Sequence, residues 1–184
     1  NDDRKNIVLS RREVIEAEEE ASRKYGAGPG AVRFISGTYA PHIELEATLA
    51  RFHGREAAMI FSSAYAAMLG VFTPLVPEET ALVSDALNHN CIINAIKLAR
   101  PKEKRVYRHN DVGELDARLT EVEGCRRALV VTDGIFSMRG DEAPLPAIFA
   151  AARKHDAAFP ENVVVIVDDS HGVGAFGATG RGTE

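Results

Sequence analysis

The sequence predicts an α/β domain with three layers, in which helices cover both faces of a mostly parallel sheet. Short apolar, β-branched runs alternate with helical patterns of apolar residues from about residue 57 onward. Such alternation is typical of parallel strands joined by crossover helices. Hydrophobic residues make up 45% of the 184 positions and charged residues 27%. This composition is that of a globular chain, and the length suits one well-buried domain.

The N-terminal part is expected to be helical. Residues 14–25 are rich in Glu and Ala, and their pattern stops at the glycines and proline of "GAGPG". A second helix is expected after Pro41, with Leu45, Leu49 and Phe52 on one stripe. We therefore expect an N-terminal helical segment over residues 1–25 and a larger domain over residues 26–184.

Five strands are expected in the larger domain, each a short run of apolar or β-branched residues. They are "AAMIF" (57–61), "ALVSD" (81–85), "KRVYRH" (104–109), "RALVVT" (127–132) and "NVVVIVDD" (162–169).

A helix is expected after each of the first four strands. The first follows in "SSAYAAMLGVF", and the second carries Ile92, Ile93, Ile96 and Leu98. Asp111 and Glu114 resemble a capping box that opens the third. The fourth is expected over residues 146–154.

Net charge, apolar runs and cysteine content argue against nucleic-acid-binding, membrane-spanning, secreted and disulfide-rich proteins. The formal net charge of −5 argues against nucleic acid as a partner, because phosphate binding needs a basic face. No apolar run approaches the roughly 20 residues of a membrane span, and no secretory signal is visible. Cys91 and Cys125 are too few for a disulfide framework or a four-ligand metal cage. A reducing, cytoplasmic compartment is the simplest interpretation.

A glycine-rich motif follows the last strand. Gly172, Gly174 and Gly177 spell G-x-G-x-x-G, a pattern of dinucleotide-binding loops. In such a loop the first glycine follows the strand almost directly, so that pyrophosphate meets a helix N-terminus. Here two acids, a serine and a histidine intervene, and the residues after the motif do not read as a helix. The glycines are therefore expected to shape a loop.

Polar residues gather where the predicted strands end, and ligands bind at this edge of a parallel sheet. Each has an ordinary structural interpretation as a cap, a turn or a surface residue. Together they offer a phosphate cradle at a helix start, an imidazole, an acid and hydroxyls, which match the needs of a phosphorylated pyridine ring. The candidates are Ser63, Ala64, Tyr65, His89, Ser137, Asp168 and His171.

A catalytic metal is the alternative at the last strand. Asp168, Asp169 and His171 could supply three ligands to a hydrolytic metal ion. That interpretation leaves His89 and Ser137 without a role, so no metal is predicted.

Six stretches resemble one enzyme family. They are "VRFISGT", H-x-x-L-E from His42 to Glu46, "DALNH", "TDGIFSM", "VDDSHGVG" and "GRGT", and they run in the expected order from residue 26 to residue 183. The chain thereby resembles the α-oxoamine synthase branch of the fold-type I pyridoxal-phosphate enzymes. "VRFISGT" and "DALNH" are most similar to the 2-amino-3-ketobutyrate coenzyme A ligases (glycine C-acetyltransferases) of that branch.

The resemblance implies a role for each residue around the ring of pyridoxal 5'-phosphate. Asp168 would pair with the protonated pyridine nitrogen, with Asp169 as a supporting acid. His171 and Ser137 would hydrogen-bond the phenolate oxygen of the ring. His89 would stack on the ring face.

The phosphate would lie at a helix start. The backbone N–H groups of Ala64 and Tyr65 would bind it, with Ser63 beside them.

The activity implied is acyl transfer from acyl-CoA, here acetyl-CoA, to the α-carbon of glycine. The products would be 2-amino-3-oxobutanoate and CoA, a step of threonine catabolism, and the enzyme would be a homodimer. Relatives resembling 8-amino-7-oxononanoate synthase or serine palmitoyltransferase remain open, as does a non-catalytic scaffold.

Three departures from the family pattern stand out. The Schiff-base lysine belongs to a motif expected beyond residue 184, and the C-terminal domain is absent. Arg139 stands where an acid is usual. The chain is therefore expected to be an incomplete large domain that is inactive alone.

Overall fold

The computed structural model describes residues 3–28 and 30–183, with side chains from residue 12 onward. It divides into two compact units, Asn1–Leu45 and Glu46–Glu184. The predicted boundary at residue 25 concerns the domains of a longer enzyme and stays a prediction.

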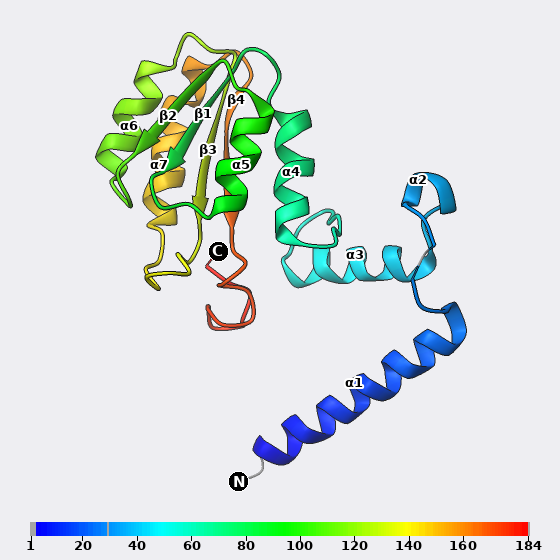
Figure 1. Ribbon diagram of the computed structural model, residues 1–184. Helices are drawn as coiled ribbons and strands as arrows, with labels where there is room; N and C mark the ends of the chain where they lie inside the picture. Colours follow the sequence, from blue (N-terminus) through cyan, green and yellow to red (C-terminus); the bar gives the residue numbers. More distant parts are fainter. Residues whose placement is uncertain (1–2, 29, 184) are drawn as a thin grey trace. The chain divides into compact units, whose positions relative to one another are not determined.

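The first unit is helical, as expected (Figure 1). It contains α1 (Asp3–Tyr25), α2 (Arg33–Ser36) and the start of α3 (Ala40–Phe52). The predicted helix over residues 14–25 is confirmed and begins earlier. α1 stops at Gly26, whose φ of 81° is a left-handed conformation that glycine adopts at little cost.

The second unit contains the sheet. Its elements after α3 are α4 (Ala64–Leu75), β1 (Thr80–Asp85), α5 (Asn90–Ala99), β2 (Glu103–Tyr107), α6 (Val112–Glu121), β3 (Arg127–Asp133), α7 (Leu145–His155), a short 3₁₀ turn (Asp156–Ala158) and β4 (Asn162–Asp168). The strands lie in the order β2-β1-β3-β4, and every described pair is parallel.

Helices cover both faces of this sheet, which confirms the predicted α/β fold (Figure 1). Alternate residues of each central strand point to opposite faces. On β1, Val83 packs in the core with α6 and α7, whereas Leu82 packs in the core with α4 and α5. On β3, Val130 and Val131 divide in the same way.

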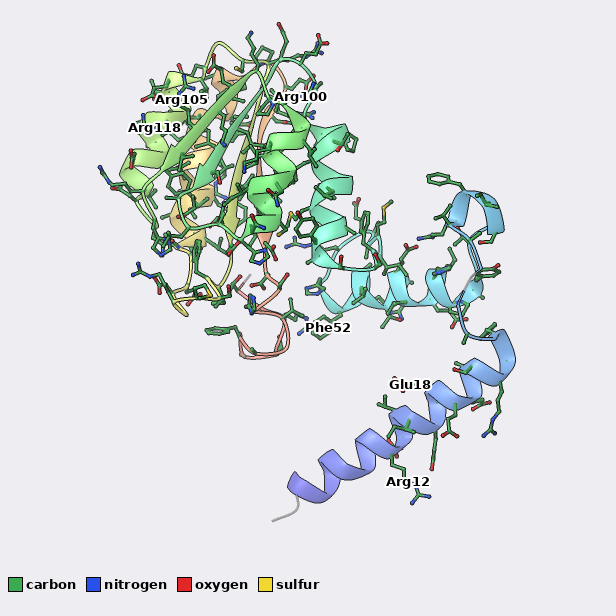
Figure 2. The ribbon with its side chains drawn as sticks, in the orientation of Figure 1. Arg12, Glu18, Phe52, Arg100, Arg105 and Arg118 are labelled. Carbon is green, nitrogen blue, oxygen red and sulfur yellow. The ribbon has the colours of Figure 1, made fainter. Side chains whose placement is uncertain are left out.

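The edge strand β2 carries charged side chains that tie it to α6. Arg105 of β2 and Arg118 of α6 are labelled in Figure 2. Both donate to the Glu121 carboxylate, at 3.0 and 2.9 Å. Exposed pairs of this kind stabilise little. Their charges do make β2 a poor template for further strand pairing.

Two caps begin helices of the second unit. The predicted capping box is half correct: the Asp111 carboxylate accepts the Glu114 N–H at 2.9 Å, but the Glu114 carboxylate accepts the Arg108 N–H at 2.7 Å. Ser63 caps α4 by accepting the Ala66 N–H at 3.1 Å.

The predicted strand over residues 57–61 is wrong. This segment has no regular secondary structure and pairs with no described strand. The Ile60 N–H donates to a Glu46 carboxylate oxygen at 3.2 Å, and Met59 is 71% exposed. A strand requires a neighbour to receive its backbone hydrogen bonds, and "AAMIF" has none among the described residues.

None of the described helices combines the length and the apolar character that a membrane span requires.

Candidate active site

Three aspartates mark the carboxyl edge of the sheet. Asp85, Asp133 and Asp168 are the last residues of β1, β3 and β4, and all three are buried. Asp133 and Asp168 are partners in the β3–β4 register. Parallel pairing therefore places several carboxylates at one edge, where ligands bind in α/β sheets.

A small cavity of about 150 Å³ lies at this edge. It brings together five of the residues predicted from the sequence with three others. The lining residues are Ala64, Tyr65, His89, Cys91, Asp133, Asp168, Ser170 and His171.

Asp168 is a buried carboxylate held by neutral donors. Oδ1 accepts the Ser170 hydroxyl at 2.5 Å and the Ser170 N–H at 3.2 Å, and Oδ2 faces the Cys91 thiol at 3.6 Å. No Lys or Arg forms an ion pair with Asp168 within the described part of the chain. A buried carboxylate favours a cationic partner, because burial alone penalises its charged form.

His89 is fixed at the start of α5. Its Nδ1 accepts the Cys91 N–H at 3.2 Å, so Nδ1 of the neutral ring carries the lone pair and Nε2 carries the proton. The His89 backbone N–H donates to Asp133 Oδ1 at 3.3 Å. These bonds determine both the position and the tautomer of the imidazole.

Cys91 is a site residue that the sequence did not reveal. Its Sγ lies 3.0 Å from His89 Nδ1 and 3.6 Å from Asp168 Oδ2. Burial, together with the charge of Asp168, raises the pKa of the thiol to about 11. Cys91 is therefore a neutral thiol between the predicted imidazole and the predicted acid.

Asn88 joins β1 and β3 at the carboxyl edge of the sheet and was also missed. Its amide donates to the Val131 carbonyl at 2.8 Å and to the Ser84 hydroxyl at 2.9 Å. Its carbonyl accepts the Asp133 N–H at 2.9 Å. Its position directly before His89 in "DALNH" was the available signal.

Asp133 differs electrostatically from an exposed aspartate. Burial raises its pKa to about 6, and the charge of Asp168 acts in the same direction. Two carboxylates close together in a buried site disfavour double ionisation, so a bound cation would stabilise both.

The start of α4 provides backbone donors to the cavity. Ala64 and Tyr65 are the first two residues of the helix, where N–H groups have no intrahelical acceptor. Such groups bind anions. Ser63 is the N-cap and does not line the cavity, while the Tyr65 hydroxyl accepts from Asn94 of α5 at 2.7 Å.

Ser137 lies outside the small cavity. It is exposed on the loop between β3 and α7 and lines a larger cavity of about 610 Å³. The two cavities share His89 and Asp133. The structure thus places Ser137 next to the small cavity, with His89 between them.

Asp169 belongs to the glycine-rich loop. Its two carboxylate oxygens accept the Thr183 N–H and the Thr183 hydroxyl, both at 2.9 Å. A Cβ at Gly134, Gly172 or Gly182 would overlap this carboxylate. Glycines are therefore needed here because Asp169 occupies the space of their side chains.

The other glycines of the motif have left-handed backbones. Gly174 and Gly177 have φ angles of 84° and 76°. The described residues after β4 (169–183) form turns and irregular backbone and contain no helix. This geometry supports a loop-shaping role and offers no helix N-terminus to a pyrophosphate.

Residues 3–183 match the family model "Aminotransferase class I and II". The chain belongs to the aminotransferase class I and II family. The match covers both compact units, including every residue of the small cavity.

The relatives of this chain include enzymes named as synthases and enzymes named as coenzyme A ligases. An 8-amino-7-oxononanoate synthase of Thermosipho melanesiensis is 45% identical over 90% of the chain, and the mitochondrial 2-amino-3-ketobutyrate coenzyme A ligase of Bos taurus is 46% identical over 96%. The chain spans 41% of the length of each. The predicted resemblance to α-oxoamine synthases is confirmed. Because the identities are similar, they do not distinguish a 2-amino-3-ketobutyrate coenzyme A ligase from an 8-amino-7-oxononanoate synthase.

Solved structures support the same family. A serine palmitoyltransferase from S. paucimobilis with a bound PLP-myriocin aldimine has a TM-score of 0.84 and 37% identity. The match covers 93% of this chain and 41% of that one. The prediction that this chain has part of the fold of a PLP-dependent transferase is therefore confirmed.

The glycine cradle of Asp169 predicts a loss of stability in Gly172→Ala. The added methyl group would displace the Asp169 carboxylate, so we expect a loss of about 1–3 kcal/mol. Urea unfolding of the full-length protein measures it. Gly124→Ala is the control, because nothing lies near its Cβ, and should change stability by less than about 0.5 kcal/mol. Equal stability of the two variants would contradict the cradle.

Proposed function

We propose that the full-length protein is a pyridoxal-phosphate-dependent C-acyltransferase that joins an acyl group from acyl-CoA to the α-carbon of an amino acid. One observation carries the proposal. Asp168 is a buried carboxylate without a described cationic partner, in a cavity that also contains two imidazoles and the start of a helix.

The residues present fit pyridoxal phosphate. Asp168 would hold the protonated ring nitrogen, since one of its oxygens is occupied by Ser170 and the other meets only a neutral thiol. The N–H groups of Ala64 and Tyr65 would hold the phosphate at the start of α4. The end of β4 would thus bind the cationic ring nitrogen, and the start of α4 would bind the anionic phosphate, in the same cavity.

When bound, the cofactor supplies an electron sink for the pair left on the α-carbon. Asp168 would keep the ring nitrogen protonated and thereby make that sink effective. His89 would stack on the ring and move a proton through Nε2, the nitrogen that its contact with the Cys91 N–H leaves protonated.

The ring oxygen would have two donors. His171 lines the small cavity, and Ser137 lies on the adjoining rim. Both can donate to a phenolate and hold it in its charged form, as the resemblance implies.

Glycine and acetyl-CoA are the proposed substrates, and 2-amino-3-oxobutanoate and CoA the products. The stretches "VRFISGT" and "DALNH", which are most similar to the ligases, support this choice, and the bovine ligase is 46% identical. The 8-amino-7-oxononanoate synthases are equally similar and make a longer acyl thioester the second candidate. A homodimer in the cytoplasm completes the proposal, although the bovine ligase is mitochondrial.

The test is an assay of CoA release by the full-length protein loaded with pyridoxal phosphate. Glycine, alanine and serine are each combined with acetyl-CoA and with longer acyl-CoA. We expect the highest kcat/KM with glycine and acetyl-CoA. A preference for alanine or serine with a longer thioester would change the substrate, and no CoA release with any pair would overturn the function.

A further inference from the structure

Ser137 is presented by a tight hairpin that links β3 to α7. In this hairpin (residues 134–143), Ile135 and Glu142 form an antiparallel bridge. The Phe136 N–H donates to the Asp141 carbonyl at 3.0 Å, and the Gly140 N–H donates to the Phe136 carbonyl at 2.7 Å. Ser137 is therefore on an exposed tip whose position depends on how the hairpin is held.

His109 lies between the hairpin and the sheet. Its Nδ1 is 3.1 Å from Asp85 Oδ1, and its Nε2 is 2.8 Å from Asp141 Oδ2. Its ring also meets the Phe136 ring edge-on, with centroids 4.3 Å apart. One mostly buried imidazole thus contacts the end of β1 and both sides of the hairpin.

The sheet end of this contact is rigid. The Asp85 side chain is fully buried and accepts the backbone N–H groups of Leu87 and Asn110, each at 2.8 Å. The hairpin end is more exposed, since Asp141 is also paired with Arg139 at 2.9 Å on the same loop. The Asn110 amide adds a bond to the Glu142 carbonyl at 3.2 Å.

We propose that His109 is a positioning residue that fixes the Ser137 hairpin to the carboxyl edge of the sheet. It keeps Ser137 at the rim that it shares with His89 and Asp133. This inference rests on the proposed function, in which Ser137 donates to the ring oxygen of the cofactor. His109 itself does not line either cavity.

The chain offers a matched control in His155. This imidazole also lies between two carboxylates, Asp116 at 2.9 Å and Glu123 at 3.2 Å. It ends α7, shortly before the start of β4, and therefore belongs to the opposite edge of the sheet from the site. Loss of its contacts should leave the hairpin unchanged.

The experiment uses His109→Leu, His109→Asn, His109→Gln and His155→Leu in the full-length protein. Asparagine places its amide near the position of Nδ1 and keeps the Asp85 contact, whereas glutamine reaches the position of Nε2 and Asp141. The rate of trypsin cleavage after Arg139, measured without cofactor, reports how firmly the hairpin is held. The dissociation constant of pyridoxal phosphate reports whether Ser137 is positioned to bind the cofactor.

We expect His109→Leu and His109→Asn to be cleaved several-fold faster than wild type and to bind pyridoxal phosphate about 3- to 10-fold more weakly. His109→Gln should recover most of both properties, and His155→Leu should change neither. If His109→Leu folds poorly, Asp141→Ala, at a half-exposed position, should reproduce its weaker cofactor binding. Cleavage is not compared for this variant, because Asp141 also pairs with Arg139. Wild-type cleavage and cofactor affinity in His109→Leu, together with wild-type cofactor affinity in Asp141→Ala, would overturn the proposal.

A double variant separates this inference from the proposed function. Adding His109→Leu to Ser137→Ala should weaken cofactor binding no further than Ser137→Ala alone, because His109 acts through Ser137. A full additional loss would contradict that link. If Ser137→Ala binds the cofactor normally, the role of Ser137 in the proposed function fails, while faster cleavage of His109→Leu still supports the hairpin contact.

Discussion

Asp168→Asn is expected to lower the acyl-transfer rate at least about 100-fold while leaving the fold intact. The amide keeps the shape of the side chain and can still accept from Ser170. It removes the charge that would keep the ring nitrogen protonated. A loss of about 3 kcal/mol of carbanion stabilisation corresponds to a factor of this size. Turnover with glycine and acetyl-CoA measures it, alongside the near-visible absorbance of the bound cofactor.

Asp169→Asn is the matched control. Its carboxylate lies in the glycine cradle with Thr183 and does not line the small cavity. We expect a loss of stability with a much smaller loss of turnover. The opposite result, with Asp169→Asn inactive and Asp168→Asn nearly normal, would mean that the acid assigned to the ring nitrogen is wrong by one residue.

His89→Phe is expected to keep the cofactor and lose most turnover. Phenylalanine can still stack on a pyridine ring but cannot transfer a proton, a role typically worth about 10²- to 10⁴-fold. The dissociation constant of pyridoxal phosphate and kcat, measured on the same preparation, separate the two roles.

The same variant removes a helix cap. His89 Nδ1 accepts the Cys91 N–H, and losing such a cap costs about 1 kcal/mol of stability. Wild-type turnover combined with this stability loss would reduce His89 to a structural residue. The unfolding midpoint therefore completes the measurement.

Much of the fold could be predicted because pattern and burial agree along the sheet. The run at residues 81–85 became β1 (Thr80–Asp85), and the valine-rich run at 162–169 became β4 (Asn162–Asp168). The segment 57–61 has a similar composition but forms no strand. Strand formation depends on a partner that lies elsewhere in the fold, and a local pattern carries no information about it.

The site was predictable where topology alone brings residues together. Asp168, His89 and the start of α4 follow or begin elements at the carboxyl edge, so parallel strands placed them in one cavity. Cys91 could not be predicted, because its importance comes from two contacts made only in the folded chain. His109 is similar, since Asp85 and Asp141 are far from it in sequence.

An experimental structure of the full-length protein with pyridoxal phosphate tests the central claim most directly. The measured quantity is the distance from each carboxylate at the carboxyl edge of the sheet to the pyridine nitrogen. We expect Asp168 Oδ2 at about 2.7–2.9 Å from that nitrogen, the His89 ring on the cofactor face and the phosphate at the N–H groups of Ala64 and Tyr65. A ring nitrogen bound by Asp133 or Asp169, or a cofactor outside this cavity, would contradict the account.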